Sequence, residues 1–135
     1  MIDLSIKNEF SSLKSVVLGL GESMGSKPKI EEAIDPKSIS SLKHGVYPLE
    51  KDIVFALNQF KSILLKHGVE VFRPTEIPDC NQVFTRDIAF VLFDKIIIPN
   101  IINERSTEQE GLKDVISLID SKNILRTPSD VHIEG

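Results

Sequence analysis

The sequence predicts an α/β fold of repeated modules, in each of which two strands, a helix and a further strand follow one another. Two stretches carry apolar residues at the three-and-four spacing of a buried helical face, and each precedes a short β-branched strand. These two strands end alike, with Arg73 before Pro74 and Arg126 shortly before Pro128, a period of about 50 residues. Neighbouring repeats of this kind usually complete one another's cores, so the modules are expected to pack together.

The first half of the chain is predicted to form a strand, an irregular excursion, a helix and a second strand. The residues Ser15 to Leu20 are apolar and β-branched and lead into glycines, as a buried strand entering a loop would. Residues 21–48 show no clear period, which favours an excursion over the surface or over a site. A helix is predicted from Pro48 to His67-Gly68, followed by a strand from Val69 to Phe72. Its apolar face would consist of Ile53, Val54, Leu57, Phe60, Ile63 and Leu64.

The second half begins with a predicted β-hairpin. Apolar strands from Val83 to Leu92 and from Lys95 to Ile98 flank Phe93-Asp94, which would form the tight turn. A further strand is predicted from Asn123 to Arg126, and a last one from Val131 into Gly135. Because this last strand has no polar tail after it, we expect the 135 residues to be a piece of a larger working unit.

A helix is predicted between the hairpin and these last strands. Ser106 or Thr107 would cap it, with Glu110 as the partner in a capping box. Its buried stripe would consist of Leu112, Val115, Ile116 and Ile119.

The composition indicates one acidic globular domain at most. The chain has 16 Lys and Arg against 20 Asp and Glu, with no basic cluster that could neutralise phosphates, which excludes nucleic acid as a partner. The longest apolar run, Ile96–Ile98, is too short to cross a membrane, and the N-terminus lacks a signal-peptide pattern. Cys80 is the single cysteine, so no disulfide is expected and a cytoplasmic location follows.

Three groups of residues resemble functional motifs only in part. Gly19, Gly21 and Gly25 follow a strand, but their spacing and the Lys27-Pro28 after them do not fit a dinucleotide loop, so a plain glycine turn is favoured. His132-Ile-Glu134 matches the start of a zinc deaminase signature without its cysteines, and two polar residues on one face of a strand are favoured. Cys80 lies next to an acidic residue that would oppose thiolate formation, so it is interpreted as a packing residue rather than as a nucleophile.

The stronger candidate is the polar cluster that runs from Asn81 through Phe84 and Thr85 to Asp87, at the head of an apolar strand. Charges that are partly buried there need partners. One interpretation is an internal network with Arg86 or with the backbone; the other is a cationic ligand bound by Asp87. Neighbouring strand residues point to opposite faces, so Arg86 would leave Asp87 free for a ligand. Arg105 and Glu134 would add further charges if the strand ends converge.

These residues resemble the arginine deiminase, dimethylarginine dimethylaminohydrolase and amidinotransferase superfamily. The resemblance consists of Asn81-x-x-Phe84-Thr-Arg-Asp87, then Pro99, Arg105 and Glu108 at matching spacing, and the terminal Ile133-Glu-Gly. The segment from Leu13 to Gly19 is also similar to the first strand of the family. The likeness extends over essentially the whole chain and rests on motifs that follow in the family's order.

The resemblance implies a five-bladed α/β propeller, or pentein, around a central site that acts on guanidino compounds without a metal or other cofactor. A cysteine thiolate attacks the guanidinium carbon, an amine leaves with a proton from a histidine, and water or another amine resolves the adduct. Carried over by position, Asp87 would hold the guanidinium nitrogens and Arg105 would bind a substrate carboxylate. Asn81 and Phe84 would line the pocket, and Glu134 would orient the histidine.

The family's nucleophilic cysteine and its catalytic histidine match no residue of this sequence. We therefore expect the chain to be the N-terminal part, about two of five modules, of an amidinotransferase or amidine hydrolase that acts on arginine or a methylated arginine. The fragment itself would be inactive, and assembly into a homo-oligomer is compatible with these expectations. A non-catalytic guanidino-binding or interaction module is the alternative, and a fragment of a zinc deaminase is a third interpretation.

Overall fold

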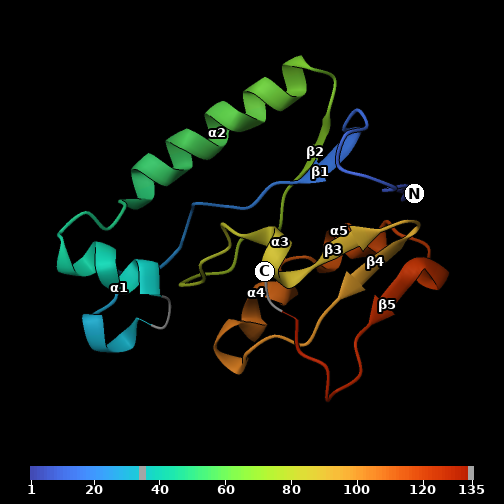
Figure 1. Ribbon diagram of the computed structural model, residues 1–135. Helices are drawn as coiled ribbons and strands as arrows, with labels where there is room; N and C mark the ends of the chain where they lie inside the picture. The colour runs from blue at the N-terminus through green and yellow to red at the C-terminus, as the bar shows by residue number, and fades with distance from the viewer. Residues whose placement is uncertain (34–35, 134–135) are drawn as a thin grey trace.

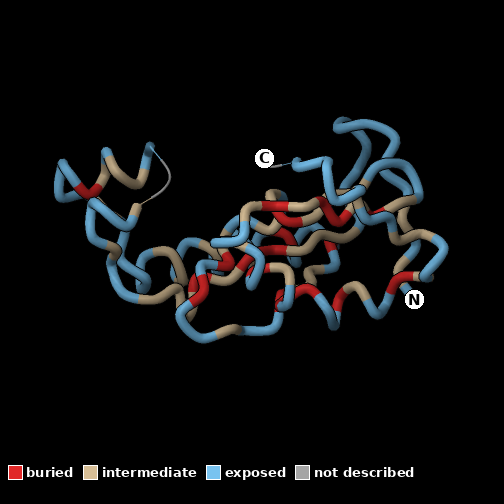
Figure 2. Tube along the Cα trace, turned by 90° about the horizontal axis from the view of Figure 1, so that it is seen from below, coloured by how far each residue is buried: buried red, intermediate tan, exposed pale blue. Residues whose placement is uncertain are grey.

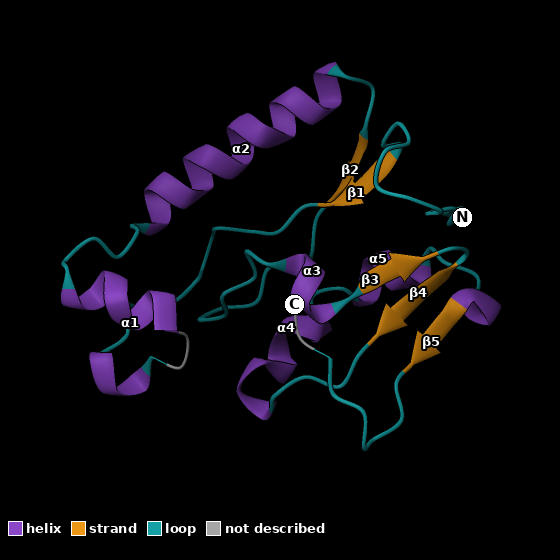
Figure 3. Ribbon diagram, in the orientation of Figure 1, coloured by secondary structure: helices purple, strands orange, loops and turns teal. Residues whose placement is uncertain are grey.

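The computed structural model describes residues 1–33 and 36–133 and shows two small β-sheets whose strands are connected by helices (Figures 1 and 3). The fold is therefore mixed α/β, as the sequence predicts. The strands are β1 (Ser15–Val17), β2 (Glu70–Phe72), β3 (Phe90–Leu92), β4 (Lys95–Ile98) and β5 (Ile124–Arg126). The helices are α1 (Pro36–Lys43), α2 (Glu50–Lys66), α3 (Thr85–Ile88), α4 (Ser106–Glu110) and α5 (Lys113–Ser117). None of these helices combines the length and apolar character needed to cross a membrane.

The first unit is a parallel pair of strands with α2 in the connection between them. β1 pairs with β2 from Ser15 opposite Glu70 onward, and Leu18 continues the ladder by donating its N–H to Phe72 O at 3.0 Å. Leu18, Val69 and Leu64 of α2 form a buried cluster, with Val16, Leu57 and Val71 packed around it. Burial of these side chains is what holds the long helix against so small a sheet.

The helix α2 confirms the predicted helix and its end, but much of its apolar surface is uncovered. His67 is the C-cap, and Gly68 has a φ of 74°, a left-handed conformation that glycine adopts without strain. Leu64 is buried, whereas Phe60 and Ile63 of the predicted apolar face are about half exposed. A sheet of two strands covers only a narrow strip of the helix, which explains why these two side chains find no cover in the described chain.

The segment expected to be an irregular excursion contains a helix. α1 begins at Pro36, and a 3-10 turn covers Ile30–Glu32. Proline suits a first helical position because its missing N–H would have no partner there. Apart from Leu42, the side chains of α1 are exposed or half exposed, and Figure 2 shows this lobe mostly in pale blue. A short helix with a single buried residue has too little apolar periodicity to be recognised in sequence.

The second unit is a three-stranded sheet in the order β3-β4-β5. β3 and β4 are antiparallel, with Phe90 opposite Ile97, and the turn at Phe93-Asp94 confirms the predicted hairpin. β5 lies parallel to β4 on its other side. Ile88, Ile101 and Leu112 are buried together beneath this unit, and Val17 of β1 packs against them, so the two units share apolar contact.

The helix predicted after the hairpin is interrupted. α4 ends at Glu110 and α5 starts at Lys113, with Arg105 as the N-cap of α4, so the predicted capping box of Thr107 and Glu110 is wrong. The carboxylate of Glu110 pairs instead with Lys113. The buried stripe is confirmed in its main members: Leu112, Val115 and Ile119 are buried and Ile116 is half buried.

The predicted repeat is not confirmed. Both units contain a parallel strand pair with helices in the connection, but among the described residues the first has no counterpart of the antiparallel strand that β3 adds to the second. Arg73 and Arg126, which suggested the repeat, also differ in exposure and in their contacts. The Arg73 side chain is 17% exposed and lies 3.6 Å from Glu22, whereas Arg126 is exposed.

The loop between the two units is fixed by the buried side chain of Gln82, which is 1% exposed. Its Oε1 accepts the N–H of Ile77 at 2.8 Å, and its Nε2 donates to Thr75 O at 2.9 Å. The backbone oxygen of Gln82 accepts the N–H of Leu20 at 2.9 Å, which ties the loop to the segment after β1. Both polar atoms of this buried side-chain amide thus have a hydrogen-bond partner within the protein.

Two glycines allow the backbone to approach this loop closely. A Cβ at Gly111 would collide with Nε2 of Gln82, and a Cβ at Gly19 would collide with the carbonyl oxygen of Val83. Thr75 N donates to Gly111 O at 2.8 Å, so the loop is also bound to the break between α4 and α5. The interruption of the predicted helix therefore follows from packing against Gln82 and not from the local sequence alone.

Replacing Gln82 by alanine is expected to lower the free energy of unfolding by about 1–3 kcal/mol, because a buried side chain is truncated and Ile77 N and Thr75 O lose their partly buried hydrogen-bond partner. Urea denaturation followed by circular dichroism measures this. The matched control is Gln59→Ala on the exposed surface of α2, which should change stability by less than about 0.5 kcal/mol. Equal effects of the two substitutions would contradict the structural role of Gln82.

Candidate functional site

Asp87 lies on α3, a single helical turn that connects the two units (Figure 1). Thr85 Oγ1 donates to Val17 O at 2.9 Å, and Asp87 N donates to Phe84 O at 3.2 Å. Ile88 follows and is 1% exposed. The strand predicted from Val83 is wrong as far as residue 89. Asp87 N and Ala89 N donate to Phe84 O and Thr85 O as in a helical turn, and Ile88 enters the core.

Arg105 contacts Asp87 from the 3-10 turn Asn103–Arg105, which precedes α4. Its Nη1 donates to Asp87 Oδ2 at 3.2 Å, and its Nε and Nη2 donate to Glu108 Oε1 and Oε2 at 2.7 and 2.8 Å. The expectation that Asp87 is free of a cationic partner is therefore wrong. The partner is Arg105 and not the neighbouring Arg86, which is exposed.

The three charged side chains are largely removed from solvent. Side-chain exposure is 18% for Asp87, 23% for Arg105 and 9% for Glu108. Hydrogen bonding to Glu108, assisted by the charges of both carboxylates, raises the pKa of the Arg105 guanidinium above its ordinary value despite its burial. Two carboxylates and one guanidinium leave a net charge of about −1 on the cluster when all three are ionised. The cluster can therefore attract a further cation.

Asn81 and Phe84, the predicted pocket-lining residues, lie in the loop before α3 and are exposed. Asn81 Oδ1 accepts the N–H of Val83 at 3.2 Å, which shapes the local turn. The Phe84 side chain is 57% exposed and precedes α3 directly. The structure thus brings Asp87 and Arg105 together but leaves Asn81 and Phe84 at the surface beside them.

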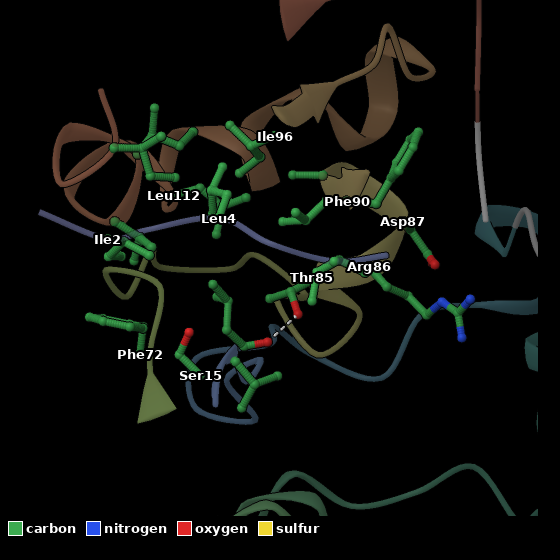
Figure 4. A pocket seen from close by; sticks show the side chains of 18 of the residues that line it. Ile2, Leu4, Ser15, Phe72, Thr85, Arg86, Asp87, Phe90, Ile96 and Leu112 are labelled. Carbon is green, nitrogen blue, oxygen red and sulfur yellow. Dashed lines mark hydrogen bonds between the residues drawn. The ribbon is translucent and has the colours of Figure 1, made fainter. Parts of the chain in front are cut away.

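A groove of about 680 Å³ lies between the N-terminal segment, β1 and the second unit (Figure 4). Thr85, Arg86 and Asp87 contribute to its lining, but most of the lining is apolar and includes Ile2, Leu4, Phe72, Phe90, Ile96 and Leu112. In Figure 4 the carboxylate of Asp87 and the guanidinium of Arg86 are directed away from these apolar side chains. The charged cluster therefore lies at the edge of the groove and not in its apolar interior.

Asn100, directly after β4 and Pro99, holds the last described residues near the second unit. Its N–H donates to Thr127 Oγ1 at 2.8 Å, and its Nδ2 donates to Val131 O at 3.1 Å. Ile133 N donates to Asn100 O at 3.1 Å, and Ile133 also lines the groove that Asp87 borders. Glu134, predicted to orient a histidine, lies outside the described residues.

The residues of the weaker motifs have structural roles in the fold: Cys80 and Gly21 are packed, and His132 forms a backbone bridge. Cys80 is buried, and burial together with the charge of Glu108 raises the pKa of its thiol. Gly21 lies against α2, and the residues directly after Gly25 form no helix, whereas a dinucleotide loop leads straight into one. His132 is exposed and forms a parallel bridge with Asn100. Within residues 1–33 and 36–133, no three His, Cys, Asp or Glu side chains gather as metal ligands would.

Sequence reasoning gave two important residues no role of their own. Glu108 was noted only for its spacing, yet it is the most buried acid of the cluster; the signal was its position three residues after Arg105, where helical side chains meet. Gln109 Nε2 donates to Ile88 O at 3.2 Å and to Pro99 O at 2.8 Å, which joins α4 to α3 and to the end of β4. The sequence does not predict these bonds of Gln109, because both acceptors are backbone oxygens, which every residue carries.

Comparison with solved structures gives clear likenesses, although no protein-family model and no curated protein sequence matches the chain. The chain is similar to the inosamine-phosphate amidinotransferase StrB1 from Streptomyces griseus, with a TM-score of 0.65, 19% sequence identity and 93% of this chain covered. It is also similar to SxtG, an amidinotransferase of the saxitoxin biosynthetic pathway from Microseira wollei, with a TM-score of 0.64, 20% identity and 90% covered.

The chain spans about two-fifths of these solved structures, 43% of the first and 40% of the second. At this level of identity the likeness is one of fold, and it extends over nearly all of the chain. The likeness to amidinotransferases that the motif from Asn81 to Asp87 implied is therefore confirmed at the level of the fold, whereas the five-bladed propeller stays a prediction: the chain has the fold of a part of these two amidinotransferases.

Proposed function

We propose that the chain is the N-terminal, substrate-binding part of an enzyme that acts on guanidino compounds, either as an amidinotransferase or as an amidine hydrolase. The observation that supports this most is the partly buried, net negative cluster of Asp87, Arg105 and Glu108 on an amidinotransferase fold. A guanidinium is planar, carries one positive charge and donates hydrogen bonds in pairs, which suits a carboxylate such as Asp87. We propose a cytoplasmic location for this enzyme.

In the proposed reaction Asp87 accepts hydrogen bonds from two guanidinium nitrogens and fixes the plane of the substrate. A cysteine thiolate then bonds to the guanidinium carbon, and the amine leaves with a proton donated by a histidine. Water or a second amine attacks the amidino adduct and releases the cysteine. Glu134 would orient the histidine, while the cysteine and the histidine would come from residues beyond this sequence.

Cys80 does not suit the role of the nucleophile. It is 8% exposed, and its pKa is raised by burial and by the charge of Glu108, so little thiolate forms at neutral pH. The only cysteine of the chain therefore contributes to packing, and the proposed chemistry needs a cysteine from elsewhere.

At pH 7, iodoacetamide is expected to alkylate Cys80 in the native protein at a rate at least about tenfold lower than in the same protein unfolded by urea. The rate should rise steadily with pH up to the raised pKa, because only the thiolate reacts. Mass spectrometry of quenched samples measures the modified fraction. Rapid alkylation at pH 7 with a plateau below pH 8 would identify an activated thiol and contradict this assignment.

Residues 1–135 alone are expected to convert no arginine, because the proposed nucleophile is missing. The assay measures citrulline, the product of hydrolysis, and ornithine, the product of amidino transfer to an added amine. An intact homologous amidinotransferase provides the positive control. Turnover of arginine by the 135-residue chain would contradict the proposed division of the active site.

Arginine is expected to raise the thermal unfolding midpoint of the chain, since a ligand that binds only the native state stabilises it. Citrulline, which replaces the guanidinium by a neutral ureido group, should not. Asp87→Asn should abolish the shift, whereas Asp94→Asn in the exposed hairpin turn should preserve it. An equal shift with citrulline, or one that survives in Asp87→Asn, would overturn the assignment of Asp87. Binding without turnover in a longer, complete chain would instead favour a non-catalytic guanidino-binding protein.

A further inference from the structure

Each of the three side-chain nitrogens of Arg105 donates a hydrogen bond to a carboxylate oxygen. Nε and Nη2 lie 2.7 and 2.8 Å from the two oxygens of Glu108, and Nη1 lies 3.2 Å from Asp87. The fork of Glu108 fixes the guanidinium plane, since two parallel hydrogen bonds permit one orientation only. Asp87 is then held by a cation that is itself fixed.

The surroundings of Arg105 are unfavourable for a third anion beside Asp87 and Glu108. Its positive charge is already shared by two carboxylates whose side chains are 18% and 9% exposed. A substrate carboxylate on Arg105 would bring a third negative charge to a cluster of net charge about −1, and the attraction would be offset by repulsion from Asp87 and Glu108. The same cluster favours a guanidinium cation at Asp87.

Given the proposed function, we infer that Arg105 and Glu108 are positioning residues: Glu108 fixes Arg105, and Arg105 orients Asp87 toward a guanidinium. This role differs from the carboxylate binding that the family resemblance implied for Arg105. The cluster then recognises the guanidino group alone. The substrate class it accepts is guanidino compounds with or without a carboxylate at the other end.

The positioning role is tested without a ligand by nuclear magnetic resonance of the 135-residue chain labelled with 15N-arginine. The Nε–H of Arg105 should exchange with water at least about tenfold more slowly than that of the exposed Arg86 and Arg126. Glu108→Gln should remove this protection, while Glu110→Gln on the exposed surface of the same helix should leave it unchanged. Exchange of Arg105 as fast as that of Arg86 would overturn the inference.

The specificity is tested by calorimetric titration with two probes of similar size. Butylguanidinium and 4-guanidinobutyrate share the guanidino group and differ in a terminal carboxylate. The chain should bind both with Kd values within about threefold of each other, and Glu108→Gln should weaken both by about tenfold without changing their ratio. Glu110→Gln should bind both as the unmodified chain does.

Arg105→Lys distinguishes the two roles, because lysine keeps the charge but cannot form the fork with Glu108. A positioning Arg105 predicts equal weakening of both probes in this variant. Tighter binding of 4-guanidinobutyrate by tenfold or more, lost selectively in Arg105→Lys, would identify a carboxylate clamp and overturn the inference. If neither probe binds, the proposed function and the inferred specificity are both contradicted. The positioning role is decided separately, by the rate at which the Arg105 Nε–H exchanges with water.

Discussion

The buried amide of Gln82 fixes the loop between the two units, and the place of the charged cluster depends on that loop. Its side chain bonds to Thr75 and Ile77, its backbone bonds to Leu20, and Gly111 lies against it. α3 begins three residues later, at Thr85. The position of Asp87 therefore depends on the contacts that Gln82 makes with both units. An amide suits this place because it offers a donor and an acceptor without a charge that would need neutralisation.

The cluster of Asp87, Arg105 and Glu108 is charged, whereas the groove beside it is mainly apolar. The groove is lined mainly by aliphatic and aromatic side chains, whereas Asp87, Arg105 and Glu108 lie partly buried at its edge. Burying three charges is unfavourable unless each is matched, and here one negative charge remains in excess. Such an arrangement contributes little to stability compared with an apolar one, and its excess negative charge is the basis for our proposal that it binds a cation.

Sequence reasoning succeeded where local pattern decides structure and failed where distant contacts do. The helix ending at Gly68 and the hairpin at Phe93-Asp94 depend on neighbouring residues and were predicted. The turn Thr85–Ile88 was predicted as a strand, because the bond of Thr85 to Val17 O lies far away in sequence. For the site, the motif identified Asp87 and Arg105, but their mutual pairing required the fold to be known. The partner of Asp87 was sought in the adjacent Arg86 for the same reason.

The two sheets differ in how far apart in the sequence their paired strands lie. Phe90 pairs with Ile97 across a tight turn, whereas Ser15 pairs with Glu70 only after the whole of α1 and α2 lies between them. Closing the larger loop costs more chain entropy before any sheet contact compensates for it. On chain entropy alone, we expect the hairpin of the second unit to form before β1 pairs with β2. Val17, which accepts the hydroxyl of Thr85, would then reach its place after the hairpin has formed, and with it the anchor of α3 and Asp87.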